Sequence, residues 1–96
     1  MGNQVLLCIL YDYYGELLTN KQQQYFKDYY FENLSLSEMS ENYDISRNAI
    51  HKNLKETEEK LFYYEEKLKL YEKNKKIKKI IDKLDDDLKN KILELI

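Results

Sequence analysis

Six polar side chains close together in the middle of the chain have the chemistry needed to contact nucleic acid. They are Ser46, Arg47, Asn48, His51, Lys52 and Lys55. An arginine can pair in bidentate fashion with guanine and an asparagine with adenine, while lysine, histidine and serine donate to phosphate. Such donors read the major groove from the start of the second helix of a helix-turn-helix, because that end enters the groove. The spacing therefore predicts a nucleic-acid-binding surface, provided that the surrounding sequence builds this motif.

Residues 34–54 have the pattern of two helices joined by a tight turn. Ser35 and Glu38 have the spacing of a reciprocal capping box, which marks a helix start. The apolar face that follows comprises Leu36, Met39 and Tyr43. Asp44 is a small polar residue that tolerates a left-handed turn, and Ser46 can cap a second helix. The apolar face of that second helix comprises Ala49, Ile50 and Leu54, which leaves the six polar side chains pointing outward.

A set of short segments between residues 11 and 71 carries a family resemblance. They are Tyr11-Asp12-Tyr13-Tyr14-Gly15-Glu16-Leu17-Leu18-Thr19 with Lys21-Gln22, Tyr29-Tyr30, Leu34-Ser35-Leu36-Ser37-Glu38, Ile45-Ser46-Arg47-Asn48-Ala49-Ile50 and Tyr64-Glu65-Glu66-Lys67-Leu68-Lys69-Leu70-Tyr71. The helix-turn-helix resembles that of region four of bacterial sigma factors, and the full set resembles the YlxM family of small bacterial proteins. This resemblance implies a regulatory DNA-binding protein. The family's genes lie beside those of the signal recognition particle GTPase, so it also implies a role in that pathway, with the GTPase or its receptor as partner.

Length and composition predict one all-α domain over residues 1–96. The chain has 96 residues with 2 glycines, no proline and 35% charged residues, a composition that suits amphipathic helices throughout. The expected architecture is a helical bundle of the winged-helix-like DNA-binding superfamily, with a sigma region-four-like motif, a long recognition helix and C-terminal helices. We expect a family core over residues 4–73 and a helical extension over residues 74–96.

Hydrophobic spacing predicts where the other helices lie. A first helix should run from Gln4 to Leu18, with Gly15 marking either a bend or the close approach of another helix. Thr19 and Gln22 have the spacing of a second capping box. No stop signal follows residue 54, so the recognition helix should continue to about Lys73. Two short helices should follow, the first capped by Asn74 and the second beginning at the aspartates of residues 85–87.

Apolar residues recur along the expected long helix with the alternating spacing of a coiled-coil seam. The seam comprises Leu54, Leu61, Tyr64, Leu68 and Tyr71. A seam of this kind needs a facing helix, which the first helix of the same chain or a second copy would provide. Phe62, Tyr63 and Leu70 add apolar surface on another side, and so wide a stripe on a small protein predicts a homodimer.

The charge distribution leaves the function of the motif open. Net charge is −2, and within residues 35–57 four carboxylates stand against Arg47 and two lysines. Arg47 can alternatively pair with Glu38 or Glu41, in which case the motif is a scaffold in a protein-interaction module. Ser40 and Asp44 also depart from the alanine and glycine that the motif favours. The Lys-rich segment 67–79 is either a phosphate-binding patch for RNA or DNA or a solvated helix face.

Little in the sequence supports an enzyme, a cofactor or a metal site. His51 is the only histidine and Cys8 the only cysteine, so no metal-ligand spacing exists. Adjacent carboxylates on a helix point to different sides and cannot pair for acid-base catalysis. The apolar run of residues 5–10 is too short to span a bilayer, so we expect no membrane insertion and a cytoplasmic protein.

Overall fold

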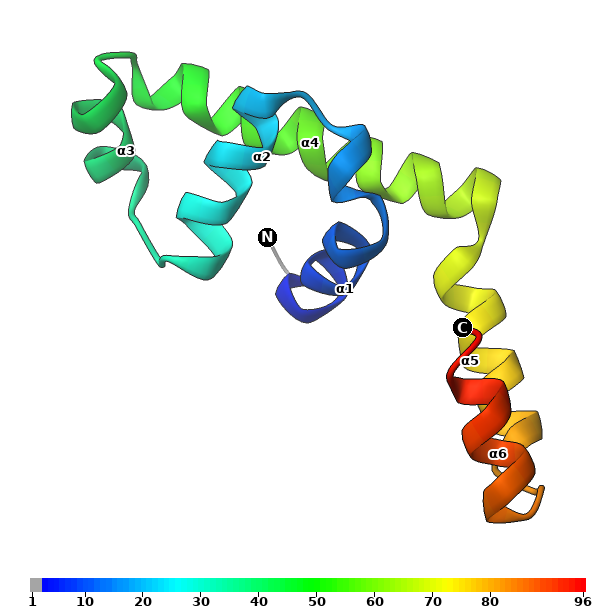
Figure 1. Cartoon of the computed structure of the whole chain (residues 1–96). Helices are drawn as coiled ribbons and strands as arrows, with labels where there is room; N and C mark the ends of the chain where they lie inside the picture. The colour runs from blue at the N-terminus through cyan, green and yellow to red at the C-terminus, as the bar shows by residue number, and fades with distance from the viewer. Residues whose placement is uncertain (1–2) are drawn as a thin grey trace.

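Helix α4 (Arg47–Leu68) is the axis against which the helices that precede it pack (Figure 1). The computed structural model describes residues 3–96. The remaining elements are α1 (Gln4–Tyr14), a 3-10 turn (Gly15–Leu17), α2 (Asn20–Phe26), a π-helical turn (Lys27–Phe31), α3 (Leu36–Tyr43), α5 (Leu70–Ile81) and α6 (Asp86–Leu93). No strand occurs in this part of the chain, which confirms the prediction of an all-α helix-turn-helix protein.

Two clusters of buried side chains fill the space between α4 and the helices that precede it. The first joins α1, α2 and the middle of α4 and comprises Leu7, Leu10, Tyr14, Leu18, Phe26 and Leu61. The second joins α2, α3 and the first half of α4 and comprises Tyr25, Met39, Ile50 and Leu54. Thr57 is also fully buried, and its hydroxyl donates to the Asn53 carbonyl at 2.9 Å, which satisfies this polar group. The inner face of α4 is therefore covered within one chain as far as Leu61.

The helix caps predicted at Thr19, Ser35 and Ser46 are present. Thr19 with Gln22, and Ser35 with Glu38, each form both hydrogen bonds of a capping box at 3.1 Å. The Ser46 hydroxyl accepts from the Ala49 amide at 3.1 Å and so begins α4. These bonds join residues three positions apart, so local sequence is enough to specify them.

The first helix ends earlier than expected, at Tyr14 rather than Leu18. Gly15 opens a 3-10 turn, and a Cβ atom built there would lie 3.0 to 3.1 Å from the Tyr11 ring. The helix therefore changes direction at Gly15, and the close approach is made by a ring of the same helix rather than by another helix. That ring is stacked on Phe26 with centroids 4.6 Å apart.

Replacing Gly15 by alanine is expected to lower the free energy of unfolding. Alanine gains about 0.5–1 kcal/mol of helix propensity over glycine, but forcing a group into a packed site costs about 1–3 kcal/mol. The Tyr11 ring cannot retreat easily because it is stacked on Phe26. Urea denaturation should give a net loss of about 1 kcal/mol. The same change made together with Tyr11→Ala should be neutral or stabilising, and an equal loss in that background would contradict the steric explanation.

The carboxylate of Glu58 is partly buried, and this burial destabilises its charged form. One of its oxygens is buried with no hydrogen-bond partner in residues 3–96, and burial raises the pKa of the Glu58 carboxyl above its ordinary value of 4.5. The folded state therefore favours the protonated form. Its contribution to stability is fully present below the unfolded pKa and is lost as pH rises through the raised folded pKa.

The Glu58→Gln variant should reveal this pH dependence. Relative to the original chain, the variant is expected to gain stability as pH rises above the ordinary carboxyl pKa of 4.5, because only the original chain loses stability by ionising Glu58. Urea denaturation across this range measures the difference. The control is Glu56→Gln, since Glu56 is an exposed glutamate on the same helix. A difference independent of pH would contradict the assignment.

The long helix is shorter than predicted, and the reason is a tertiary contact. Helix α4 ends at Leu68, because Lys69 takes a left-handed conformation with φ of 55°, and α5 begins at Leu70. The prediction that the helix runs to Lys73 was wrong. Asn74 lies inside α5 rather than capping it, and its amide donates to the Tyr13 hydroxyl at 2.7 Å.

Glu65 caps the first turn of α5 across the break in the helix. Its carboxylate accepts from the amides of Tyr71 and Glu72, each at 3.1 Å. Tyr14 of α1 donates to the same carboxylate at 2.6 Å and accepts from the Leu70 amide at 3.1 Å. Burial, together with the bond to Glu65, raises the pKa of Tyr14 to about 12. We call this group of contacts the hinge cap.

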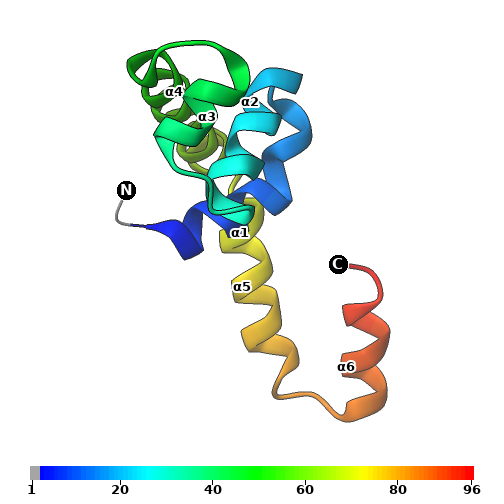
Figure 2. The same cartoon turned by 90° about the vertical axis from the view of Figure 1, so that its left-hand side faces the viewer.

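Helices α5 and α6 form an arm (residues 69–96) that projects away from the rest of the molecule, which we call the body (Figures 1 and 2). The molecule measures 54 × 25 × 23 Å, with a radius of gyration of 16.9 Å. A compact domain of this length has a radius of about 13 Å. Ile81 is the one buried residue of α5, and α6 has none. The arm is thus held at its base by the hinge cap and by the contacts of Tyr71 and Asn74 with Tyr13, and its outer part is largely open to solvent.

Candidate nucleic-acid interface

The corner between α3 and α4 is built by hydrogen bonds within the turn. Asp44 takes the left-handed conformation with φ of 53°, which its short polar side chain tolerates. The Ser40 hydroxyl donates to the Ile45 carbonyl, and the Ile45 amide donates to the Ser40 carbonyl at 3.2 Å. The two departures from the usual motif, Ser40 and Asp44, are therefore accommodated, and the helix-turn-helix forms.

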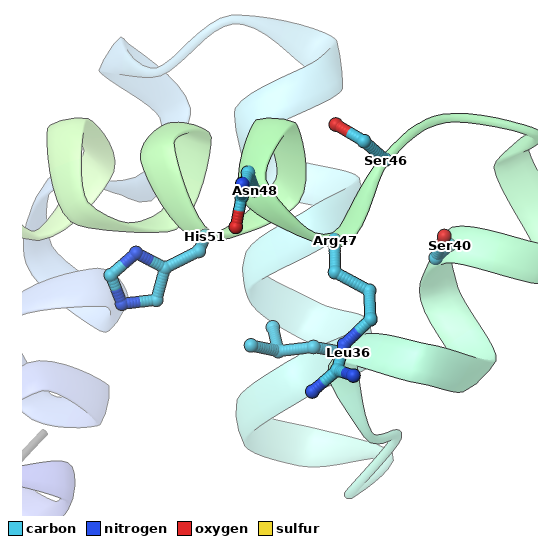
Figure 3. A pocket seen from close by; sticks show the side chains of 6 residues that line it. All are labelled: Leu36, Ser40, Ser46, Arg47, Asn48 and His51. Atoms are coloured by element: carbon cyan, nitrogen blue, oxygen red, sulfur yellow. The ribbon is translucent and has the colours of Figure 1, made fainter.

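The six side chains predicted to contact nucleic acid are all exposed. Ser46, Arg47, Asn48, His51, Lys52 and Lys55 lie along the outer side of the first three turns of α4. The corner also holds an open hollow of 720 Å³, lined by Leu36, Ser40, Ser46, Arg47, Asn48 and His51. In Figure 3 the Arg47 side chain extends toward Leu36 of α3, and His51 projects from the next turn of α4. The structure brings four of the six residues together around this hollow, while Lys52 and Lys55 lie outside its lining.

Arg47 is available to bind a ligand. Within residues 3–96 the guanidinium forms no ion pair, either with Glu38 or with Glu41, which the sequence offered as partners. Glu38 is instead engaged with the Ser35 amide at 3.1 Å. A guanidinium without a partner presents all its donors in a planar fork, the geometry that suits a base edge or a phosphate.

Contacts that the sequence did not reveal fix the position of α3. The π-helical turn after α2 buries Asp28, whose carboxylate accepts from Tyr43 at the end of α3 and from Gln24 at 2.9 Å. Burial and the bond to Asp28 raise the pKa of the Tyr43 phenol. The Leu34 amide also donates to the Asp28 carbonyl at 2.9 Å. The only feature of the sequence that could have indicated these contacts is the position of Asp28 among aromatic residues, between Phe26 and Tyr29.

The predicted seam along α4 is packed mainly within the chain. Leu54 and Leu61 are fully buried, and the ring centroids of Tyr64 and Tyr71 lie 5.9 Å from that of Tyr14 and 6.0 Å from that of Tyr13, respectively. Leu68 is 44% exposed at the end of the seam. The earlier helices of the same chain therefore occupy most of the surface that the sequence had offered to a second copy.

The Lys-rich segment does not join the basic residues of the motif. Lys55 and Lys67, the first lysine of that segment, lie twelve residues apart on α4, or about 18 Å at the rise of an α-helix, with the half-buried Lys60 between them. Exposed carboxylates of Glu56, Glu59 and Glu66 occupy this stretch. Beyond Lys69 the arm turns away from α4 (Figure 1). The protein has two separate basic regions, one at the corner and one on α5.

Comparison with known proteins places these features in a family. The family model UPF0122, described as "Putative helix-turn-helix protein, YlxM / p13 like", matches residues 1–95. The chain belongs to this family. A UPF0122 protein of Listeria innocua is 45% identical over 83 residues, which cover 86% of this chain and 76% of that protein. A UPF0122 protein of Oceanobacillus iheyensis is 49% identical over 75 residues, covering 78% of this chain and 71% of that protein. The resemblance to YlxM is confirmed, and the UPF0122 match extends over the arm as well as the body.

Within the described part of the chain there is neither a metal-binding cluster nor a membrane-spanning helix. No three histidine, cysteine or carboxylate side chains among residues 3–96 come close enough to hold a metal ion. No helix in that range has both the length and the apolar character needed to cross a membrane.

Proposed function

We propose that this protein is a DNA-binding regulator that contacts the duplex through the outer face of α4, beginning at Ser46. The observation that carries the proposal is the exposed Arg47 guanidinium at the motif corner, free of any ion pair within residues 3–96. Asn48 lies beside it at the helix start, where side chains reach base edges, and Lys52 and Lys55 follow at spacings suited to phosphate. Nucleic acid of the cytoplasm is the expected target.

Fluorescence anisotropy with labelled duplexes of random sequence tests this proposal directly. We expect affinity that falls as salt rises, with a log–log slope of about −2 to −3, because Arg47, Lys52 and Lys55 release few counterions. Single-stranded DNA and duplex RNA serve as comparisons, since a groove reader should prefer duplex DNA. No binding to any duplex at low salt would remove the proposal.

A second candidate is a protein-docking role, and the local charge favours it. Glu41, Asp44 and Glu56 are exposed around the motif, and these carboxylates weaken attraction for phosphate. In this alternative the helix-turn-helix is a scaffold, and the partner is the signal recognition particle GTPase or its receptor. A pull-down with the full chain should then recover one of these proteins. Failure to recover either, together with duplex binding, would favour the first candidate.

We also propose that the protein is a homodimer, as expected of a helix-turn-helix protein that reads paired half-sites. What supports this is the apolar surface left open outside the seam, above all Phe62, Tyr63 and Ile80. Light scattering at micromolar concentration should give twice the mass of one chain. A single-chain mass would contradict the dimer without affecting the proposed DNA contact.

A further inference from the structure

The arm lacks the burial that a stable pair of helices requires. Helices α5 and α6 have 12 and 8 residues, and isolated helices shorter than about 12–15 residues are marginal in water. Ile80 on α5 is 65% exposed, and Leu95 after α6 is 85% exposed. Short helices acquire most of their stability by packing an apolar face against another element. The arm therefore needs a surface to cover it.

One exposed stripe of the arm combines apolar and basic side chains. The exposed Lys73, Lys76 and Ile80 and the half-buried Ile77 lie along one side of α5, and Lys76 also pairs with Glu72 of the same helix at 3.2 Å. We call Lys73, Lys76, Ile77 and Ile80 the arm stripe. The arm as a whole has nine lysines against six carboxylates. A surface that covers this stripe should be apolar at its centre and acidic at its edges.

The outer face of α4 combines apolar and acidic side chains in this way, with one basic neighbour, Lys67, whose ammonium lies 5.7 Å from the centre of the Tyr63 ring. Phe62 and Tyr63 are 39% and 55% exposed, and Glu59 and Glu66 lie one turn before and one turn after them. We call these four residues the α4 stripe. Its side chains point away from the core, because the neighbouring Leu61 is fully buried on the inner face. The body, residues 3–68, is acidic as a whole, with twelve carboxylates against seven basic residues.

The two stripes cannot meet within one chain. The hinge cap fixes the start of α5 through Glu65 and Tyr14, and the arm leaves the end of α4 in a direction away from the body (Figures 1 and 2). A second chain offers the same pair of stripes in complementary places. Charge and apolar surface therefore match between copies rather than within one.

We propose that a second copy of this chain covers the arm, with the arm stripe of each chain packed against the α4 stripe of the other. This inference rests on the homodimer proposed above and adds the surface that forms it. The contact is reciprocal, as two-fold symmetry requires. It uses the last third of α4, whereas Arg47 and its neighbours lie at the other end of a helix about 33 Å long. Both motif corners therefore stay free in the dimer.

Two charge-reversed chains test the proposal. The first carries Lys73→Glu with Lys76→Glu, and the second carries Glu59→Lys with Glu66→Lys. In a dimer of either double variant, like charges face each other at both contacts. The dissociation constant of the dimer should therefore rise at least about tenfold. Mixed in equal amounts they should form a heterodimer, because the reversed arm meets the reversed α4 stripe and the two original surfaces meet each other. Light scattering and native mass spectrometry measure both results.

A matched pair of aspartate variants checks the apolar part of the contact. Ile80→Asp should produce monomers, whereas Leu17→Asp, at a position 53% exposed in the 3-10 turn, should leave the dimer intact. Far-UV circular dichroism confirms that each variant is folded. If the arm variants dissociate the dimer but the α4 variants do not, arm packs on arm and the proposal is wrong. If the mixture fails to form a heterodimer, it is also wrong. A monomeric original chain would instead refute the dimer itself.

Discussion

Replacing Arg47 and Lys52 together by alanine is expected to reduce affinity for duplex DNA by about 10–100-fold at low salt. A bidentate arginine contact to a base contributes about 1–3 kcal/mol of binding free energy. A lysine contact to phosphate adds an electrostatic contribution that weakens as salt increases. Both side chains are exposed on α4 and neither supports the core, so the variant should keep its fold. Anisotropy titrations at several salt concentrations measure the loss, and the salt slope should become shallower by about 1 to 2.

The matched control removes the same charge from the arm. Lys78→Ala with Lys91→Ala changes two exposed lysines that belong neither to the motif nor to the arm stripe. This control should bind DNA almost as the original chain does. If the control loses as much affinity as the motif variant, the Lys-rich arm contributes to phosphate binding. If the motif variant binds as well as the original chain, the groove-reading function is refuted.

Replacing Glu65 by alanine is expected to loosen the arm from the body. The variant loses the bonds from the Tyr71 and Glu72 amides and leaves the buried Tyr14 hydroxyl without its acceptor. A lost helix cap costs about 0.5–2 kcal/mol, and an unsatisfied buried donor costs about 1–3 kcal/mol. We expect the free energy of unfolding to fall by about 2–3 kcal/mol. Hydrogen exchange should accelerate first at the amides of residues 70–72.

Glu56→Ala is the control for this loss. Glu56 is an exposed glutamate on the same helix with no hydrogen bond or ion pair within residues 3–96. Its replacement should leave both stability and exchange nearly unchanged. Tyr14→Phe should show a smaller form of the same effect, because the carboxylate keeps its two amide donors. Equal exchange at residues 70–72 in all variants would contradict the hinge cap.

The features that the sequence determined are those set by contacts a few residues apart. Two capping boxes, the Ser46 cap and the left-handed Asp44 were all predicted and are all present, because each depends on neighbours along the chain. The exposure of the six polar residues also followed from helical periodicity, once Ile50 and Leu54 were assigned to the core. The motif and its outward face are thus local consequences of sequence.

The tertiary structure decided where α4 stops, what covers its seam and how α3 is held. The Glu65 carboxylate that caps α5 also accepts from Tyr14, fifty-one residues earlier, and no local pattern predicts that bond. The Asp28 carboxylate likewise accepts a hydrogen bond from Tyr43, fifteen residues later. Asp28 lies in a π-helical turn that the hydrophobic spacing did not indicate. Long-range contacts depend on how helices meet in space, and helical periodicity specifies which face is apolar without specifying its partner. For this reason the sequence indicated a wide apolar surface, and only the fold separated the part buried within the chain from the part left open on the arm.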